Sequence, residues 1–127
     1  MAVKYAIYKC EICGNIVTVV EDGGGELICC GQEMTLLKEK TVNEEGKEKH
    51  VPVVEINGNK VTVTVGSVHH PMEPNHYIML IQLMDGDKIL FEKWLQPGQQ
   101  PVAEFLVDKA ENLKAREYCN MHGLWKN

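Results

Sequence analysis

The chain has 127 residues, of which 44% are hydrophobic and 24% are charged, so it can form one ordinary domain or a small module joined to a larger one. The net charge of -5 is spread along the chain and argues against a nucleic-acid-binding protein, which would carry a basic face. No apolar run approaches the roughly 20 residues of a membrane-spanning helix, and residues 1–5 lead to Cys10 without the apolar segment of a signal peptide. We therefore expect a cytoplasmic protein with no membrane or nucleic-acid partner.

The composition changes near residue 40, which predicts a small module over residues 1–38 and a larger domain over residues 39–127. The first segment holds four of the five cysteines, a probable strand at residues 16–20 and the turn Gly23-Gly24-Gly25. A segment this short buries little apolar surface and usually needs a metal or a disulfide for stability. Residues 41–49 are polar and charged, which is typical of a linker or an exposed loop.

The four N-terminal cysteines have the pattern of a metal site. Cys10 and Cys13 lie across a tight turn, and Gly14 supplies the backbone freedom that such a turn needs. Cys29 and Cys30 are neighbours, and a disulfide between neighbours is strained. An odd number of cysteines and a reducing cytoplasm also favour metal over disulfides. Four thiolates fit zinc or iron, and their spacing does not choose between a purely structural zinc and an iron.

From residue 50 onward the sequence alternates with the period of β-strands. Turn signals at residues 57–59, 85–87 and 97–98 separate the alternating segments. This spacing predicts an antiparallel, immunoglobulin-like β-sandwich, so the whole chain is expected to be all-β. Residues 110–117 allow either a strand or a turn of helix. The predicted strands are residues 51–56, 60–65, 77–84, 88–95 and 102–107.

A second group of possible ligands is spread over the larger domain. We expect His50 and His76 to open strands, His70 to lie in a loop stiffened by Pro71, and the last two ligands to share a C-terminal turn. Loops at one end of a sandwich would bring them together. Four nitrogens and one sulfur are too many for a closed zinc site and too soft for magnesium or calcium, which indicates a redox metal with an open position. The five residues are His50, His70, His76, Cys119 and His122.

Some neighbouring residues allow two interpretations. Cys119 could instead be a small buried hydrophobic residue. His69 is left out of the ligand set, because two adjacent histidines rarely reach the same ion. Glu48 and Lys49 could be solvated loop charges, or they could serve the open position, where Lys49 attracts an anion and supports its protonation and Glu48 becomes a reversible sixth ligand.

These motifs, in this order, resemble the two-iron superoxide reductases, also called desulfoferrodoxins, over nearly the whole chain. The resemblance implies a desulforedoxin-like module followed by an immunoglobulin-like domain of seven strands, usually as a homodimer. The matching segments are Cys10-Glu11-Ile12-Cys13, Cys29-Cys30, Glu48-Lys49-His50-Val51-Pro52, His70-Pro71-Met72, His76 and Cys119-Asn120-Met121-His122-Gly123.

The resemblance also implies cofactors and an activity. One iron would be held by the four N-terminal cysteines, and a second by four equatorial histidines with Cys119 as the axial thiolate. The expected reaction is the one-electron reduction of superoxide to hydrogen peroxide, with an external donor such as rubredoxin restoring the ferrous iron. The four-cysteine iron could relay electrons or mainly stabilise its module. The rival hypotheses are an electron carrier without a substrate and a zinc-stabilised structural or binding module.

Overall fold

The computed structural model describes residues 2–109 and 111–127. The chain divides into two compact units, Met1–Lys38 and Glu39–Asn127, which are described separately below. Nearly all the regular structure is β-strand, as the sequence predicts. Among the described residues, no helix is long and apolar enough to cross a membrane.

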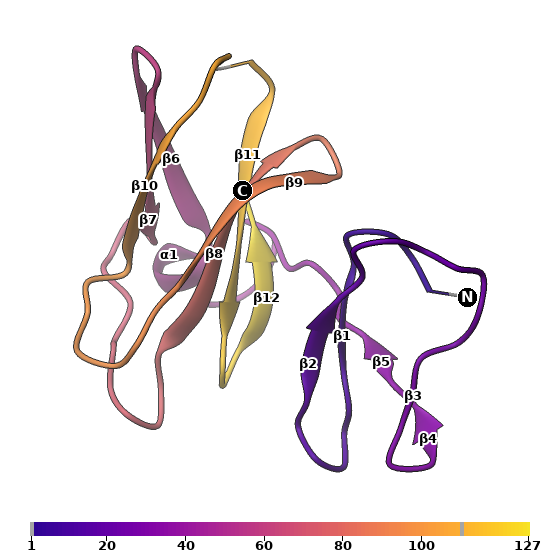
Figure 1. Ribbon diagram of the computed structural model, residues 1–127. Helices are drawn as coiled ribbons and strands as arrows, with labels where there is room; N and C mark the ends of the chain where they lie inside the picture. The colour runs from indigo at the N-terminus through magenta and orange to yellow at the C-terminus, as the bar shows by residue number, and fades with distance from the viewer. Residues whose placement is uncertain (1, 110) are drawn as a thin grey trace. The chain divides into compact units, whose positions relative to one another are not determined.

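The smaller unit consists of short antiparallel strands (Figure 1). Within residues 2–38, β1 lies between β2 and β5 in one sheet, while β3 and β4 form a separate hairpin. The predicted strand at residues 16–20 is confirmed in its first part. The strands are β1 (Ile7–Lys9), β2 (Ile16–Thr18), β3 (Ile28–Cys29), β4 (Gln32–Glu33) and β5 (Thr35–Leu36).

The smaller unit has a very small apolar core. Its buried hydrophobic side chains are Ile7, Tyr8, Cys10 and Val19. Several other apolar side chains lie largely exposed, among them Ile12, Val20, Ile28 and Leu36. Because so little apolar surface is buried, the hydrophobic effect alone gives this unit little stability, and cross-links between its cysteines become important.

The larger unit is a sandwich of two antiparallel sheets (Figure 1). Within residues 39–109 and 111–127, one sheet has the order β10-β7-β6 and the other the order β12-β11-β8-β9. The predicted immunoglobulin-like architecture is thereby confirmed. The strands are β6 (Pro52–Asn57), β7 (Lys60–Val65), β8 (Ile78–Asp85), β9 (Lys88–Trp94), β10 (Val102–Leu106), β11 (Leu113–Cys119) and β12 (Gly123–Lys126).

The structure departs from the sequence prediction at α1 and at the last strand, and it decides one segment that the sequence left open. The charged segment before His50 ends in a short helix, α1 (Lys47–His50), so His50 ends a helix and does not begin a strand. Its Nδ1–H donates to the carbonyl of Gly46, which closes this turn. The ambiguous segment at residues 110–117 becomes a strand from Leu113, while Ala110 lies outside the described residues. The final strand, β12, was not predicted.

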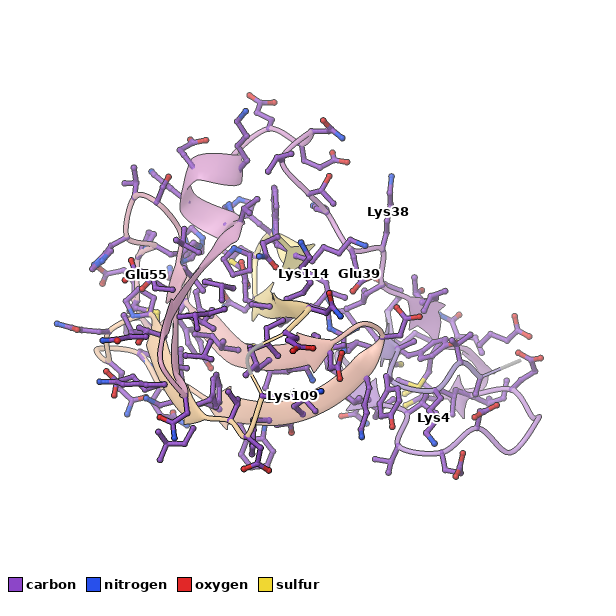
Figure 2. The ribbon with its side chains drawn as sticks, turned by 90° about the horizontal axis from the view of Figure 1, so that it is seen from above. Lys4, Lys38, Glu39, Glu55, Lys109 and Lys114 are labelled. Carbon is purple, nitrogen blue, oxygen red and sulfur yellow. The ribbon has the colours of Figure 1, made fainter. Side chains whose placement is uncertain are left out.

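Alternate residues of the strands fill the space between the two sheets, as the period of two requires. Charged side chains such as Glu55, Lys109 and Lys114 are exposed and project outward (Figure 2). The interior side chains include Val61, Val63 and Val65 from β7, Ile81 and Leu83 from β8, Ala103 from β10, and Leu113, Ala115 and Cys119 from β11. The core therefore reaches Cys119 at the end of β11.

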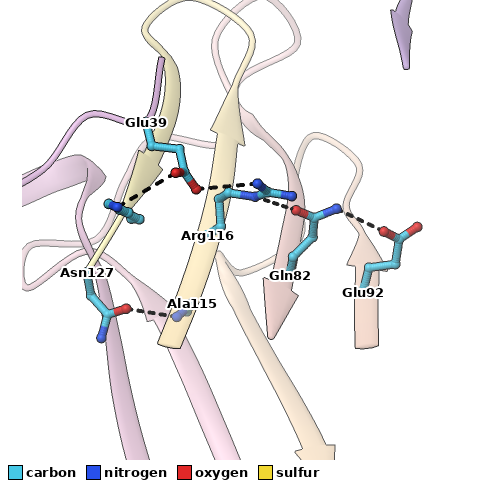
Figure 3. Close-up of polar contacts among 7 residues, drawn as sticks. Glu39, Gln82, Glu92, Ala115, Arg116 and Asn127 are labelled. Atoms are coloured by element: carbon cyan, nitrogen blue, oxygen red, sulfur yellow. Dashed lines mark hydrogen bonds and ion pairs between the residues drawn. The ribbon is translucent and has the colours of Figure 1, made fainter. Parts of the chain in front are cut away.

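A polar network crosses the other face of the four-stranded sheet (Figure 3). Arg116 donates from Nε to Gln82 at 2.8 Å and pairs through Nη1 with Glu39 at 3.3 Å. Gln82 in turn donates to Glu92, and Lys126 pairs with Glu39. Burial lowers the pKa of Arg116, and the charge of Glu39 opposes that shift. The network connects the first residue of the larger unit to all four strands of this sheet, β8, β9, β11 and β12.

Candidate metal centres

The first candidate centre is formed by Cys10, Cys13, Cys29 and Cys30, the four cysteines of the smaller unit. Their sulfur atoms lie within 4.8 Å of one another, and all four cysteines are free. Cys10 directly follows β1, and its sulfur accepts a hydrogen bond from the backbone N–H of Cys13. Cys30 has a positive φ of 54° in the β3–β4 turn, which places two neighbouring cysteines on the same site.

The pKa shifts of these thiols fit a site that binds a cation. The backbone N–H of Cys13 is the main cause that lowers the pKa of Cys10 to about 6. Hydrogen bonds that the Cys30 thiol donates to Cys13 and Cys10 raise its pKa to about 12, and a hydrogen bond to Cys13 is the main cause that raises the pKa of Cys29. One thiolate thus forms readily and suppresses the ionisation of its neighbours. A metal cation removes that suppression, because it neutralises several thiolates at once.

The second candidate centre brings together all five residues that the sequence predicts in the larger unit. His50 ends α1, His70 follows β7, His76 precedes β8, and Cys119 and His122 flank the turn from β11 to β12. Their ligand atoms lie within 4.8 Å of one another. His69 is exposed and is outside this group, as expected.

The four imidazole rings form a closed cycle in the order His50, His70, His76, His122. Neighbouring ring centroids are 4.7 to 4.9 Å apart, and neighbouring planes differ by 65 to 85°. The Nε2 atoms of His50 and His70 are 3.1 Å apart, and Nε2 of His76 is 3.2 Å from Nδ1 of His122. Two ligands at right angles, each about 2.1 Å from one ion, would be about 3 Å apart. The cycle therefore has the dimensions of four equatorial ligands.

The sulfur of Cys119 lies off this cycle. It is 3.4 Å from Nε2 of His70 and 3.8 Å from Nδ1 of His122, which are opposite members of the cycle. If the four imidazoles are the corners of a square, a sulfur close to two opposite corners lies above or below the centre of that square and not beside one edge. Cys119 is also fully buried in the core, whereas His122 is exposed and His76 is partly exposed. The thiol thus occupies an axial position on the core side, and solvent reaches the group from the side of His76 and His122.

The hydrogen bonds of two histidines test whether the group fits a metal. Nδ1 of His50 donates to the carbonyl of Gly46 at 2.9 Å, and Nδ1 of His70 donates to that of Pro71 at 2.6 Å. A carbonyl only accepts, so both protons are on Nδ1 and both Nε2 atoms present lone pairs. These lone pairs face each other at 3.1 Å with no proton between them. A bound cation would relieve this repulsion, so the residues fit a metal ion.

The pKa shifts agree with neutral imidazole ligands. Burial is the main cause that lowers the pKa of His50, of His76 and of His70, the last to about 4. His70 therefore stays neutral well below neutral pH, and burial favours the neutral, metal-binding form of His50 and His76. Burial raises the pKa of the Cys119 thiol, while the backbone N–H groups of Met121 and His122 oppose that shift. Bound metal would supply the charge that makes this thiol a thiolate.

Glu48 and Lys49, the other residues that the sequence singles out, lie on α1 with exposed side chains. Among the described residues, neither side chain has a hydrogen-bond or ion-pair partner. Lys49 is near enough to His76 to lower the pKa of that imidazole, after the larger effects of burial and of His122. The carbonyl of Glu48 accepts from the Val68 N–H and the Ser67 hydroxyl, which fixes the backbone but leaves both side chains free to move.

Sequence reasoning missed Trp125, the fully buried tryptophan of β12. Its ring stacks on His50 with centroids 4.7 Å apart, and its Nε1–H donates to the carbonyl of His122 at 3.0 Å. Trp125 therefore supports two ligands at once. The available signal was its position three residues after His122.

Comparison with known proteins agrees with this arrangement. The Desulfoferrodoxin family model matches residues 42–127, and the model of the desulfoferrodoxin N-terminal domain matches residues 2–37. A desulfoferrodoxin homolog from Archaeoglobus fulgidus is 56% identical over 121 residues, which cover 95% of this chain and 94% of that protein. The superoxide reductase from Treponema pallidum has a TM-score of 0.73 at 29% identity and covers 96% of both chains. The one-iron superoxide reductase from Giardia intestinalis has a TM-score of 0.56 at 40% identity and covers 64% of this chain and 96% of its own.

Fold and sites together define a two-centre non-haem metalloprotein, with one all-sulfur site and one site of four imidazoles and a thiol. The chain belongs to the desulfoferrodoxin family. The two groups of side chains match the two iron centres of that family, so the cofactors are two iron ions per chain, one on each group.

Proposed function

We propose that this protein is a superoxide reductase that converts superoxide to hydrogen peroxide at the five-residue centre. Each superoxide anion takes up one electron and two protons, and no dioxygen is formed. The observation that carries this proposal is the cycle of four imidazoles with a buried thiol on one side and solvent on the other. Iron bound there would supply a one-electron donor with a position open to a small anion, and the Cys119 thiolate would donate electron density to it.

The charged residues of α1 have separate roles in this proposal. The exposed Lys49 ammonium attracts the superoxide anion toward the solvent side of the centre and supports protonation of the product. Glu48 is adjacent to Lys49, and its carboxylate has no partner among residues 2–109 and 111–127, so it would be available as a reversible sixth ligand of oxidised iron. The hydrogen bond to the Glu48 carbonyl holds in place the short helix that carries both side chains.

An external one-electron donor of the rubredoxin type would restore the reduced centre after each turnover. The four-cysteine iron either relays these electrons or mainly stabilises the smaller unit. The five free thiols fit the reducing cytoplasm, which we propose as the compartment. The exposed apolar side chains of the smaller unit, including Val20, Ile28 and Leu36, are consistent with the homodimer that we propose.

The test starts with protein purified without oxygen and analysed for iron and zinc. The reduced protein is then exposed to pulses of superoxide while its visible absorption, the hydrogen peroxide and the dioxygen are followed. One peroxide per superoxide, no dioxygen and oxidation of the second centre are expected. Release of dioxygen would indicate a dismutase, and a ferrous centre that ignores superoxide would indicate an electron carrier. A colourless zinc protein would indicate a structural module.

A further inference from the structure

Lys40 lies at the start of the larger unit, and its backbone is bound to the strand that follows the last metal ligand. Its N–H donates to the carbonyl of Leu124, and its own carbonyl accepts from the N–H of Lys126, both at 2.9 Å. These bonds form a parallel bridge between Lys40 and Trp125. The position of the Lys40 side chain is therefore set by β12 and not by a loose linker.

The Lys40 ammonium binds the segment that carries two of the five ligands. Its Nζ donates to the carbonyl of His122 at 2.9 Å and lies 5.4 Å from the centre of the Trp125 ring. The His122 carbonyl also accepts from Trp125 Nε1–H, so it receives one charged and one neutral donor. A Cβ atom on Gly123 would lie only 3.9 Å from Nζ. The ammonium thus packs directly against the Cys119–His122 turn.

The charge of Lys40 lies close to two of the ligands. Its Nζ binds the His122 carbonyl at 2.9 Å and lies 5.4 Å from the centre of the Trp125 ring, which stacks on His50. Lys40 is not part of the motifs that carry the family resemblance and it ligates nothing itself. Through these contacts, Lys40 places a fixed positive charge next to the metal ligands.

We propose that Lys40 is a positioning residue of the five-residue centre: its ammonium fixes the His122 carbonyl and favours the reduced state of the iron bound there. The oxidised iron has one more positive charge than the reduced iron, so a nearby cation disfavours the oxidised state more. A charge-assisted hydrogen bond to the backbone of a ligand also holds that ligand in place. This inference rests on iron at the centre and not on superoxide as the substrate.

The test compares Lys40→Met, which keeps an apolar stem against Trp125 but removes the charge and the donor, with Lys40→Arg, which keeps both. Lys114→Met is the matched control, because Lys114 is an exposed lysine of β11 and the change in net charge is the same. For each protein, the midpoint potential of the second centre, its oxidised absorption spectrum and the rate of iron loss to a chelator are measured. None of these readouts needs superoxide.

Lys40→Met is expected to lower the midpoint potential, shift the thiolate-to-iron absorption band and speed iron loss severalfold. Lys40→Arg is expected to stay near the original protein, and Lys114→Met to leave all three quantities unchanged. Equal potentials and equal iron loss in Lys40→Met and Lys114→Met would overturn the proposal. If Lys40→Met does not fold, Lys40→Gln decides the question, since its potential must also lie below that of the original protein.

Discussion

Glu117 places a carboxylic acid in the interior of the sandwich. It lies on β11 between the core residues Ala115 and Cys119, and its side chain is 1% exposed. Among the described residues, neither carboxylate oxygen has a hydrogen-bond partner. Burial raises the pKa of Glu117 well above its ordinary value, so the folded protein holds this residue protonated.

Glu117→Gln should therefore change how stability depends on pH. Below the ordinary glutamate pKa of about 4.3, the side chain is protonated in both states and adds no pH dependence. Above it the unfolded chain releases the proton while the folded chain keeps it, so stability falls by up to about 1.4 kcal/mol per pH unit until the folded pKa is reached. Glutamine cannot ionise, so the variant should lose this decline and gain stability relative to the original protein as the pH rises.

Urea unfolding at several pH values, with metal content matched between the proteins, measures the effect. Glu55→Gln serves as the control, because Glu55 is exposed on β6 and the substitution makes the same change of side chain. If the free energy of unfolding depends on pH in the same way in Glu117→Gln and in the original protein, the burial of Glu117 does not raise its pKa.

Lys49→Ala tests electrostatic attraction at the single-residue scale. If the Lys49 ammonium attracts superoxide, its removal should slow the bimolecular reaction by about tenfold at low salt and weaken the dependence of that rate on ionic strength. Lys47→Ala is the matched control, since Lys47 is an exposed lysine at the other end of α1. The rates are measured by pulse radiolysis. Equal salt dependence in both variants would argue against a specific role for Lys49.

At the scale of elements, the turn after β7 supports the helix that carries Glu48 and Lys49. The Val68 N–H and the Ser67 hydroxyl donate to the Glu48 carbonyl at 2.9 and 3.2 Å. A Cβ atom built on Gly66 would lie 2.7 Å from that same carbonyl oxygen, closer than real Cβ contacts allow. The turn and the helix are therefore in direct backbone contact, and only glycine leaves room for it.

Gly66→Ala should push α1 away from this turn. The neighbouring atoms belong to the backbone and cannot rotate aside, so we expect a loss of stability of about 1–3 kcal/mol. Because α1 carries His50, the absorption spectrum of the second centre should change as well. Urea unfolding and the visible spectrum measure the two effects. Gly23→Ala is the control, since a Cβ there meets no atom within 4 Å, and equal stability of the two variants would contradict the contact.

The elements also show what the sequence could predict. The strand at residues 60–65 was predictable from its alternation, and it and the strand at residues 88–94 were also predictable from the flanking Asn-Gly and Asp-Gly turns, because both signals are local. Helix α1 was not, because its four residues have no apolar period and depend on the His50 side chain bonding to Gly46. The ligand residues could be chosen from their chemistry and order. The roles of Lys40, Trp125 and Glu117 depend on contacts between distant segments, which no local pattern encodes.

At the scale of the whole molecule, the two metal groups draw their ligands from separate units. All four sulfurs of the first centre come from residues 10–30, and all five ligands of the second come from residues 50–122. Each centre can therefore form within its own unit. The smaller unit has little core of its own, so we expect its metal to contribute much of its stability.

Cys13→Ser in the full chain separates the two centres. Serine is a poor ligand for a thiolate site, so the first iron and its absorption should be lost, and iron should fall from two to one per chain. The reduced second centre should still react with superoxide at the original rate, because its five ligands are untouched. Turnover with an external donor then separates the two roles of the first iron: slower turnover supports a relay, and unchanged turnover supports a stabilising role. Loss of the superoxide reaction in the reduced variant would contradict the independence of the two centres.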